Sequence, residues 1–370
     1  MDMTPDPALH SAAKLRPAWE ALVANAAEAN CFYMPAMLLP ALRHLADQDD
    51  VRLIEAWRDD TLIGLLPVAI ASRHGRYPIA NVTNWTHRHC FFGAPIIRKG
   101  QEIHAWEHFL SALDGADWAP HFLHLTGLDS DGANVAALQE VCARQRRGLR
   151  SIHGYARAFL KSRLSADEYW ETHIRGKKRK EIRRLQKRLK ELGTMTSSTL
   201  THVDDISAWC DAFLALELAG WKGVEGTAMA CNPADAAFFR DCIASAFADG
   251  TVDFLRLDFD GKPIAMLVNF LMGEGAFSFK IAFDETMARF SPGVLIEIDN
   301  LRHVLDSGGA DWMDSCAAPG HPMIDSLWAE RRHIVQYRVA LRGIRRSIAW
   351  HALQIVDNIT ARLRALNGKK

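Results

Sequence analysis

The stretch ARFSPGVLIEIDNLRHVL, residues 288–305, places a proline and a glycine directly before a helical pattern of apolar residues. It follows the apolar run GAFSFKIAF (275–283), which predicts a β-strand, and it precedes the short apolar segment DWMDSC (311–316). Strand, glycine-bearing loop and helix in this order bring unpaired backbone N–H groups and the positive end of a helix dipole to one point. The sequence therefore predicts a site for an anion, such as a phosphate or pyrophosphate, at the start of this helix.

The residues of this loop have distinct expected roles. Gly293 lets a ligand approach the backbone closely, and Pro292 rigidifies the loop without donating a hydrogen bond. Ser291 can cap the helix or contact a phosphate, and Arg289 adds positive charge. A plain helix cap uses the same residue types, so the loop alone leaves both interpretations open.

Two segments that start 201 residues apart are alike: VRLIEAWRDDTLIGLLPVAI from Val51 and VDFLRLDFDGKPIAMLVNFL from Val252. Each has two apolar runs around a polar turn, which predicts a β-hairpin. A helical pattern that begins with a proline precedes each hairpin, at Pro35 and at Pro233. The repetition predicts a tandem duplication of one α/β domain, and chance similarity of two ordinary hairpins is the alternative.

The length of 370 residues exceeds the usual size of one hydrophobic core, so two domains are expected. The two halves meet around residues 150–175. We therefore expect an N-terminal domain at 1–150, a C-terminal domain at 151–342 and a basic amphipathic helix at 343–370.

The composition is that of a soluble globular protein, with 49% apolar residues. No run of 18 apolar residues predicts a membrane span, and no signal-peptide pattern is seen, so we expect a cytoplasmic protein. Seven scattered cysteines without a CxxC pair indicate reduced thiols. The pair His87 and His89 has no third ligand in the sequence pattern, so no metal is expected.

The net charge of zero hides a segregation of charge along the chain. Residues 175–190 carry ten Lys or Arg against one Glu, and residues 331–370 carry ten against one Asp, so each block is about +9. The remaining residues must then sum to about −18. Two separate surfaces that face anions are the simplest interpretation.

The first basic block lies in the stretch LSADEYWETHIRGKKRKEIRRLQKRLKELG, residues 164–193, which is expected to be one helix. Its apolar residues form one stripe, and Gly193 ends the pattern. The stripe consists of Ile182, Leu185, Leu189 and Leu192. The other faces are almost wholly basic, which indicates either an anionic partner or simply a solvated surface.

The second basic block ends in an amphipathic pattern. Residues 343–370 interleave isoleucines and leucines with arginines. Such a helix fits peripheral contact with an anionic membrane, and it equally fits a helix docked on its own domain.

Three parts of the sequence together resemble the GNAT acyltransferase superfamily: the basic helix, LELAGWKGVEGTA (216–228), and FKIAFDETMARFSPGVLIE (279–297) with the DWMDSC segment that follows. More narrowly, they are similar to the cellulose-biosynthesis acetyltransferase branch, which is related to Fem-type aminoacyl transferases. The resemblance covers residues 150–340, with the N-terminal half as a degenerate copy. It implies an α/β fold of tandem GNAT-like domains, each with a mixed, mostly antiparallel sheet flanked by helices.

In that family the loop before the long helix holds the pyrophosphate of coenzyme A. The resemblance therefore implies an acyl-CoA co-substrate without a metal. Its binding residues would be Arg289, Phe290, Ser291, Pro292, Gly293 and Val294. The loop departs from the commonest GNAT form because it has one glycine, and Fem-type relatives use aminoacyl-tRNA as the donor.

N-acyl transfer from a thioester needs a neutral amine, a polarised carbonyl and a proton for the leaving thiolate. The expected bases are carboxylates and a histidine near the cleft, and the expected acid is a tyrosine. These catalytic candidates are Glu217, Asp314, His321 and, as the acid, Tyr337. The substrate-binding candidates are Trp221, Lys222, Lys280 and Asp284, the last of which can instead cap its loop.

The expected function is transfer of an acyl group from acyl-CoA to a primary amine of a cell-envelope precursor. Relatives of this type serve exopolysaccharide, adhesin and sphingolipid pathways, so a long-chain acyl group on a sphingoid base, as in bacterial ceramide synthesis, is the narrower form. That form would place the protein on the inner face of the cytoplasmic membrane.

Two alternatives stay open. A Fem-like transferase would use the first basic block to contact tRNA phosphates, the one nucleic acid expected as a partner. A non-enzymatic GNAT-fold effector would bind a phosphorylated signal through the arginines of RRHIVQYRVALRGIRR, residues 331–346.

Overall fold

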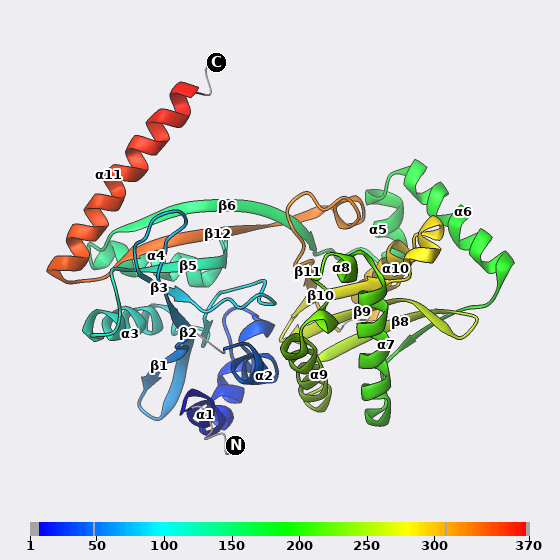
Figure 1. The fold of residues 1–370 in the computed structure, drawn as a ribbon, viewed down its shortest axis with the longest axis horizontal. Helices are drawn as coiled ribbons and strands as arrows, with labels where there is room; N and C mark the ends of the chain where they lie inside the picture. Colours follow the sequence, from blue (N-terminus) through cyan, green and yellow to red (C-terminus); the bar gives the residue numbers. More distant parts are fainter. Residues whose placement is uncertain (1–6, 47–48, 308, 368–370) are drawn as a thin grey trace. The chain divides into compact units, whose positions relative to one another are not determined.

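The computed structural model describes residues 7–46, 49–307 and 309–367 (Figure 1). The chain divides into two compact units that are each discontinuous in sequence. The first unit contains Ala29–Asp47 and Tyr155–His333, and the second contains Asp6–Glu28, Gln48–Gly154 and Ile334–Lys370.

The first unit has the strand order β6-β11-β10-β9-β8-β7. Its strands are β6 Leu149–Leu160, β7 Met195–Thr199, β8 Val252–Phe259, β9 Lys262–Met272, β10 Gly275–Phe283 and β11 Trp312–Asp314. Its helices are α2 Pro35–Leu45, α5 Ala166–His173, α6 Gly176–Leu192, α7 Ile206–Ala219, α8 Trp221–Val224, α9 Pro233–Ala248 and α10 Pro292–Ser307. Short 3-10 helices are η1 Cys31–Tyr33, η2 Val203–Asp205, η3 Met229–Cys231, η4 Glu285–Phe290 and η5 Ile324–Ser326.

The second unit has the strand order β1-β2-β3-β5-β12, with β4 paired to β2. Its strands are β1 Arg52–Arg58, β2 Thr61–Ala71, β3 Asn81–Asn84, β4 Ile96–Ile97, β5 Phe122–Asp129 and β12 Glu330–Ala340. Its helices are α1 Pro7–Val23, α3 Glu102–Gly115, α4 Ala133–Arg144 and α11 Ile344–Asn367. Strands β6 and β12 each carry the chain from one unit into the other.

The two units repeat one topology. In the first, β8–β9 and β9–β10 are antiparallel, β10–β11 is parallel and β11–β6 is antiparallel. In the second, β1–β2 and β2–β3 are antiparallel, β3–β5 is parallel and β5–β12 is antiparallel. A helix, α10 or α3, follows the third strand of each series and precedes the fourth. The predicted hairpins, the tandem arrangement and the mostly antiparallel α/β sheets are confirmed.

Helix α2 does not belong to the hairpin that follows it in sequence. It packs on α9 of the first unit, where Arg43 Nη1 and His44 Nε2 each lie 2.8 Å from Asp241 Oδ2. The sequence predicted the same helix and hairpin grouping in both halves. That grouping holds for α9 and the β8–β9 hairpin of the first unit. It fails for α2, which precedes the β1–β2 hairpin of the second unit in sequence but belongs to the first unit, because its apolar face is buried there. The two units also cross the expected boundaries at 150 and 342.

The predicted basic helix is broken in two. A Ser165–Glu168 capping box starts α5, and α6 begins separately at Gly176. Three residues of the predicted stripe, Ile182, Leu185 and Leu189, are buried, whereas Leu192 is exposed. The core of this unit also takes up the apolar side of α10, through Leu295, Ile296, Ile298 and Leu301.

Candidate active site

The predicted strand, loop and helix are present as β10, η4 and α10. The Asp284 carboxylate accepts hydrogen bonds from the backbone N and Oγ1 of Thr286, at 2.9 and 2.7 Å, and so caps η4. Asp284 was expected either to bind substrate or to cap its loop, and its contacts are those of a loop cap. This cap fixes the direction in which the chain enters α10.

Ser291 forms the sharp turn between η4 and α10. It is a non-glycine residue in the left-handed region, with φ of 53°, and its carbonyl accepts hydrogen bonds from the N–H groups of Val294 and Leu295 at 2.9 and 3.1 Å. Pro292 has no N–H, and in the described part of the chain the Gly293 N–H has no backbone acceptor. The Gly293 N–H is therefore left without a backbone partner at the positive end of the helix dipole, although Pro292 and Gly293 are themselves buried.

The side chains around this turn separate into exposed and buried ones. Arg289 is exposed, with its guanidinium 4.7 Å from the centre of the Phe290 ring, and no acidic residue occupies the first turn of α10. Phe290 itself is part of the hydrophobic core of the first unit, so its side chain anchors the loop to that core. The first turn of α10 thus carries no acidic side chain of its own, whereas the preceding η4 begins with Asp284 and Glu285.

The equivalent helix of the second unit, α3, begins differently. Glu102 stands in its first turn and accepts a hydrogen bond from the Gly100 N–H at 3.0 Å. A carboxylate of the protein itself is therefore at the helix end that binds anions. The chain before α3 contains the segment FFGAPII, residues 91–97. Its Gly93 packs so closely that a Cβ would overlap the Asn84 side chain and the Thr126 carbonyl, which gives it a structural role.

Residues expected on the acceptor side come together beside β10. Lys222 Nζ lies 2.8 Å from Glu217 Oε1, and the Met229 N–H donates to Glu217 Oε2 at 2.8 Å. The Trp221 N–H donates to Glu285 Oε1 at 2.6 Å, which ties the α8 turn to η4. With both oxygens engaged, the buried Glu217 holds the α8 turn in place.

Lys280 lies near this group, at an irregularity in the pairing of β10 with β9 between Ser278 and Lys280. Burial, and then the charge of Lys222, lowers the pKa of Lys280 to about 8, although Glu217 and Asp235 act in the opposite direction. A hollow of about 20 Å³ lined by Glu217, Trp221 and Lys222 is the size of a single water.

Asp314, at the end of β11, is completely buried between two arginines. Its carboxylate lies 2.7 Å from Arg157 Nε and 3.0 Å from Arg332 Nη1. Burial alone would raise the pKa of Asp314, but Arg157 and Arg332 hold it below its usual range. No sequence pattern indicated this triad, because its three members come from β6, β11 and β12. As a carboxylate that is difficult to protonate, Asp314 is better suited to fixing these strands than to accepting a proton.

His321 lies in the loop after β11. Its ring Nδ1 is buried and has no hydrogen-bond partner in the described part of the chain. The same loop reaches the start of α10, since Met323 Sδ is 3.5 Å from the point at which a Cβ on Gly293 would lie. The predicted histidine and the predicted anion site are thus on adjoining segments.

Tyr337 belongs to the second unit, on β12. Its phenol oxygen accepts a hydrogen bond from Gln139 Nε2 of α4 at 3.0 Å. The structure therefore gives Tyr337 a contact within that unit and does not group it with the α10 entrance.

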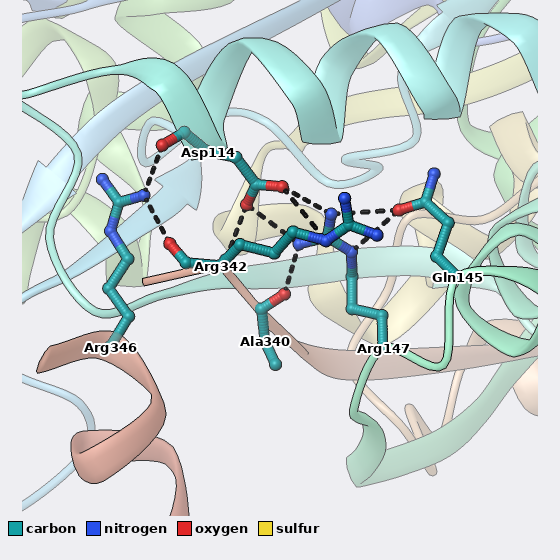
Figure 2. Close-up of polar contacts among 6 residues, drawn as sticks. All are labelled: Asp114, Gln145, Arg147, Ala340, Arg342 and Arg346. Carbon is teal, nitrogen blue, oxygen red and sulfur yellow. Dashed lines mark hydrogen bonds and ion pairs between the residues drawn. The ribbon is translucent and has the colours of Figure 1, made fainter. Parts of the chain in front are cut away.

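The arginines expected to bind a signal in the effector alternative are largely engaged by the protein. Arg338 pairs with Asp357 at 2.9 Å, and Arg346 donates to the Ala116 carbonyl at 2.8 Å. Arg346 also donates to the Asp114 carbonyl at 2.8 Å (Figure 2). Figure 2 also shows Asp114 between Arg147 and the start of α11, where the Arg342 N–H donates to Asp114 Oδ1 at 2.7 Å. These contacts anchor α11, which lowers the number of arginines available to a ligand.

Membrane-spanning helices and metal centres are two other kinds of feature on which the structure bears. In the described residues, no helix is both long enough and apolar enough to cross a membrane. Within the same residues, no group of three His, Cys, Asp or Glu side chains is placed to hold a metal ion.

Comparison with known proteins gives a family for one part of the chain. The profile of the acetyltransferase (GNAT) domain matches residues 176–321. No curated protein sequence matches the chain.

Solved structures share the fold of nearly the whole chain. FemX has a TM-score of 0.58 at 9% identity, covering 86% of this chain and 95% of its own. A protein of unknown function from Bacteroides thetaiotaomicron has a TM-score of 0.58 at 13% identity, covering 92% and 99%. The C-terminal domain of a protein assigned as a lysylphosphatidylglycerol synthetase from Agrobacterium fabrum has a TM-score of 0.54 at 12% identity, covering 93% of this chain and 97% of its own. At these identities the likeness concerns the fold, and the family match to the acetyltransferase (GNAT) domain is confined to residues 176–321.

Proposed function

We propose that the protein is an N-acyltransferase whose donor is an acyl-CoA, bound at the start of α10 in the first unit. The observation that carries the proposal is the contrast between two equivalent helix ends. The α10 entrance combines the Gly293 N–H with the exposed Arg289, whereas the α3 entrance is occupied by its own Glu102. Only the former suits a pyrophosphate.

The neighbouring strands fit the rest of such a donor. β11 pairs with β10 only from Gly275 to Phe277, and β10 continues to Phe283 beside the α10 entrance. An arm that carries amide groups can lie along the continuing strand as an added strand does. A thioester bound this way would have its pyrophosphate at Gly293 and its carbonyl close to β10.

His321 is the proposed base. The acceptor amine loses a proton to the His321 imidazole as its nitrogen attacks the thioester carbonyl. Collapse of the tetrahedral intermediate forms the amide and breaks the C–S bond, and the thiolate then takes a proton from the imidazolium or from water. Glu217 and Asp314 act in this scheme as positioning residues, because their carboxylates are held by Lys222 and by Arg157 with Arg332.

The acceptor is proposed to be a primary amine of a cell-envelope precursor that also carries an anionic group. The ammonium of Lys280, on β10, would attract that group, with Lys222 adding positive potential. In the lipidic form of this proposal, the acceptor is a sphingoid base and the donor carries a long acyl chain. The end of the sphingoid base that bears a phosphate or hydroxyl would then face Lys280.

Calorimetric titration with free CoA, acetyl-CoA and palmitoyl-CoA tests the donor. The charge reversal Arg289→Glu is placed on an exposed side chain and should weaken CoA binding about tenfold or more. Gly293→Trp should abolish binding, whereas Gly309→Trp, at a glycine with open space around it near the other end of α10, should leave it unchanged. No binding of any CoA by the folded wild type would refute the proposal.

One observation supports a second candidate, an aminoacyl-tRNA donor. Helix α6 contacts η4 and exposes eight basic side chains: Arg175 at its N-cap, Lys177, Lys180, Arg183, Arg184, Lys187, Arg188 and Lys190. A phosphate backbone fits this surface, and its binding would weaken steeply with salt. The double variant Lys180→Glu with Arg184→Glu should lose tRNA binding if this donor is used, and CoA titration of the same variant separates the two candidates.

A further inference from the structure

Helix α11 carries an exposed apolar stripe. Ile344, Ile348, Ile355 and Ile359 are 84%, 66%, 60% and 53% exposed. At 100° per residue these four positions fall within one narrow sector of the helix. Isoleucines exposed to this degree are costly in water, so a stripe of four indicates a binding surface.

The other side of α11 is held by the second unit. Trp350 and Leu353 are buried against Phe122. Asp357 is paired with Arg338, and the helix start is anchored at Asp114 (Figure 2). Figure 1 shows the red helix extending away from the strands of its own unit. The stripe is therefore presented by an anchored helix whose inward face is already occupied.

The charge around the stripe fits an anionic surface. Residues 343–370 contain six Lys or Arg and one Asp, a net charge of +5. The one Asp is Asp357, which Arg338 already neutralises. Arg345, next to the first isoleucine, is exposed. Apolar side chains flanked by cations are the composition that binds at the interface of anionic bilayers.

A second copy of the helix fits the stripe less well. If Ile348 and Ile355 occupy the d positions of a heptad pattern, the a positions are Ala352 and Ile359, but Arg345 precedes and Arg362 follows this run. The apolar seam therefore covers fewer than two heptads, whereas a coiled coil sustains about three or four. A coiled-coil seam needs apolar residues at both positions. The sequence pattern therefore disfavours a paired helix.

We propose that the stripe formed by Ile344, Ile348, Ile355 and Ile359 docks the protein on an anionic lipid bilayer, with α11 lying in the plane of the membrane interface. This surface lies outside the donor site and does not depend on the proposed reaction. If that reaction uses lipidic substrates, docking would place the enzyme where they are found.

Co-flotation of the full-length protein with vesicles tests the proposal. Vesicles of phosphatidylcholine alone are compared with mixed vesicles of phosphatidylcholine and phosphatidylglycerol. We expect binding to the mixed vesicles that weakens with added salt. The double variant Ile348→Glu with Ile355→Glu should lower the partition coefficient by about tenfold or more.

A matched control distinguishes the stripe from any exposed apolar residue. Val203, in η2 of the first unit, is 66% exposed, the same fraction as Ile348. Val203→Glu should leave vesicle binding unchanged. Equal thermal stability and CoA binding in all variants would show that folding and the donor site are intact.

Three outcomes would overturn the proposal. Wild type that does not float with the mixed vesicles excludes a bilayer as the partner. Equal partition of wild type and the double isoleucine variant shows that the stripe is not the binding surface. A dimer in light scattering that the double variant converts to a monomer assigns the stripe to a second copy of the chain.

Discussion

Glu297 of α10 is a buried carboxyl group whose ionisation should make the stability of the first unit depend on pH. Its Oε2 accepts a hydrogen bond from Asn300 Nδ2 at 3.2 Å. Burial raises the pKa of Glu297 to about 7, and the hydrogen bond from Asn300 offsets part of that effect. Replacing Glu297 by Gln removes the ionisation while keeping the size of the side chain and an acceptor oxygen for Asn300.

The sign of the effect follows from proton binding. The ordinary pKa of this carboxyl is 4.5, so between pH 4.5 and about 7 the folded protein retains a proton that the unfolded chain has released. Stability is therefore fully present below pH 4.5 and is lost as the pH rises through about 7. That interval corresponds to roughly 3 kcal/mol at 1.36 kcal/mol per pH unit.

Thermal unfolding of wild type and Glu297→Gln from about pH 4 to about pH 8 measures this loss. The two proteins should have similar stability near the acidic end, and the variant should be more stable at the alkaline end by roughly 3 kcal/mol. For a unit of this size the difference in melting temperature is about 6–12 °C. Glu191→Gln, on an exposed side chain of α6, is the control and should follow wild type throughout. A difference between Glu297→Gln and wild type that does not change with pH would refute the reasoning.

Three further predictions concern charged groups. Asp114→Asn should lower the free energy of unfolding by about 3–5 kcal/mol, because it removes the charge partner of the buried Arg147; a loss below about 1 kcal/mol in urea unfolding would match an exposed pair instead. Since burial lowers the pKa of Lys280 to about 8, turnover of the wild type should fall above that pH, and in Lys280→Arg the fall should move to higher pH. If turnover of the two proteins falls at the same pH, Lys280 does not bind the acceptor. The hydrogen bond with Asp253 raises the pKa of His303, so this pair stabilises the folded protein below pH 6.5, and the stabilisation is lost as the pH rises through the pKa of His303 in the folded state. Asp253→Asn should bring the pKa of His303, measured by NMR, back toward 6.5.

The local elements of the fold followed well from sequence patterns. The two hairpins, the strand 275–283 and the helix after Pro292 were predicted, and each is present. Their signals are short-range: alternation of apolar residues, a polar turn, and a proline with a glycine before a helical pattern. The basic helix was predicted with its buried stripe, although its break before Gly176 and the exposure of Leu192 were not.

The candidate site was predicted in part. Glu217, Trp221 and Lys222 form one group, in which Lys222 pairs with Glu217. This group is joined to the loop before α10, because the Trp221 N–H donates to Glu285 of η4. The surroundings that decide their chemistry were not predicted, because Glu217 and Asp314 were expected as bases and are instead held in ion pairs. The choice of His321 as the base depends on this comparison and stays a proposal.

The sequence by itself determined what adjacent residues can form, including the hairpins, the glycine-bearing entrance to α10 and the amphipathic character of α6 and α11. The tertiary structure alone decided which distant residues meet. It assigned α2 to α9 through Asp241, joined Arg157 and Arg332 on Asp314, and placed Glu102 on α3 as the counterpart of the open α10 entrance. The physical reason is that periodicity and turn chemistry act over a few residues, whereas burial and ion pairing depend on partners that the chain brings together from far apart in sequence.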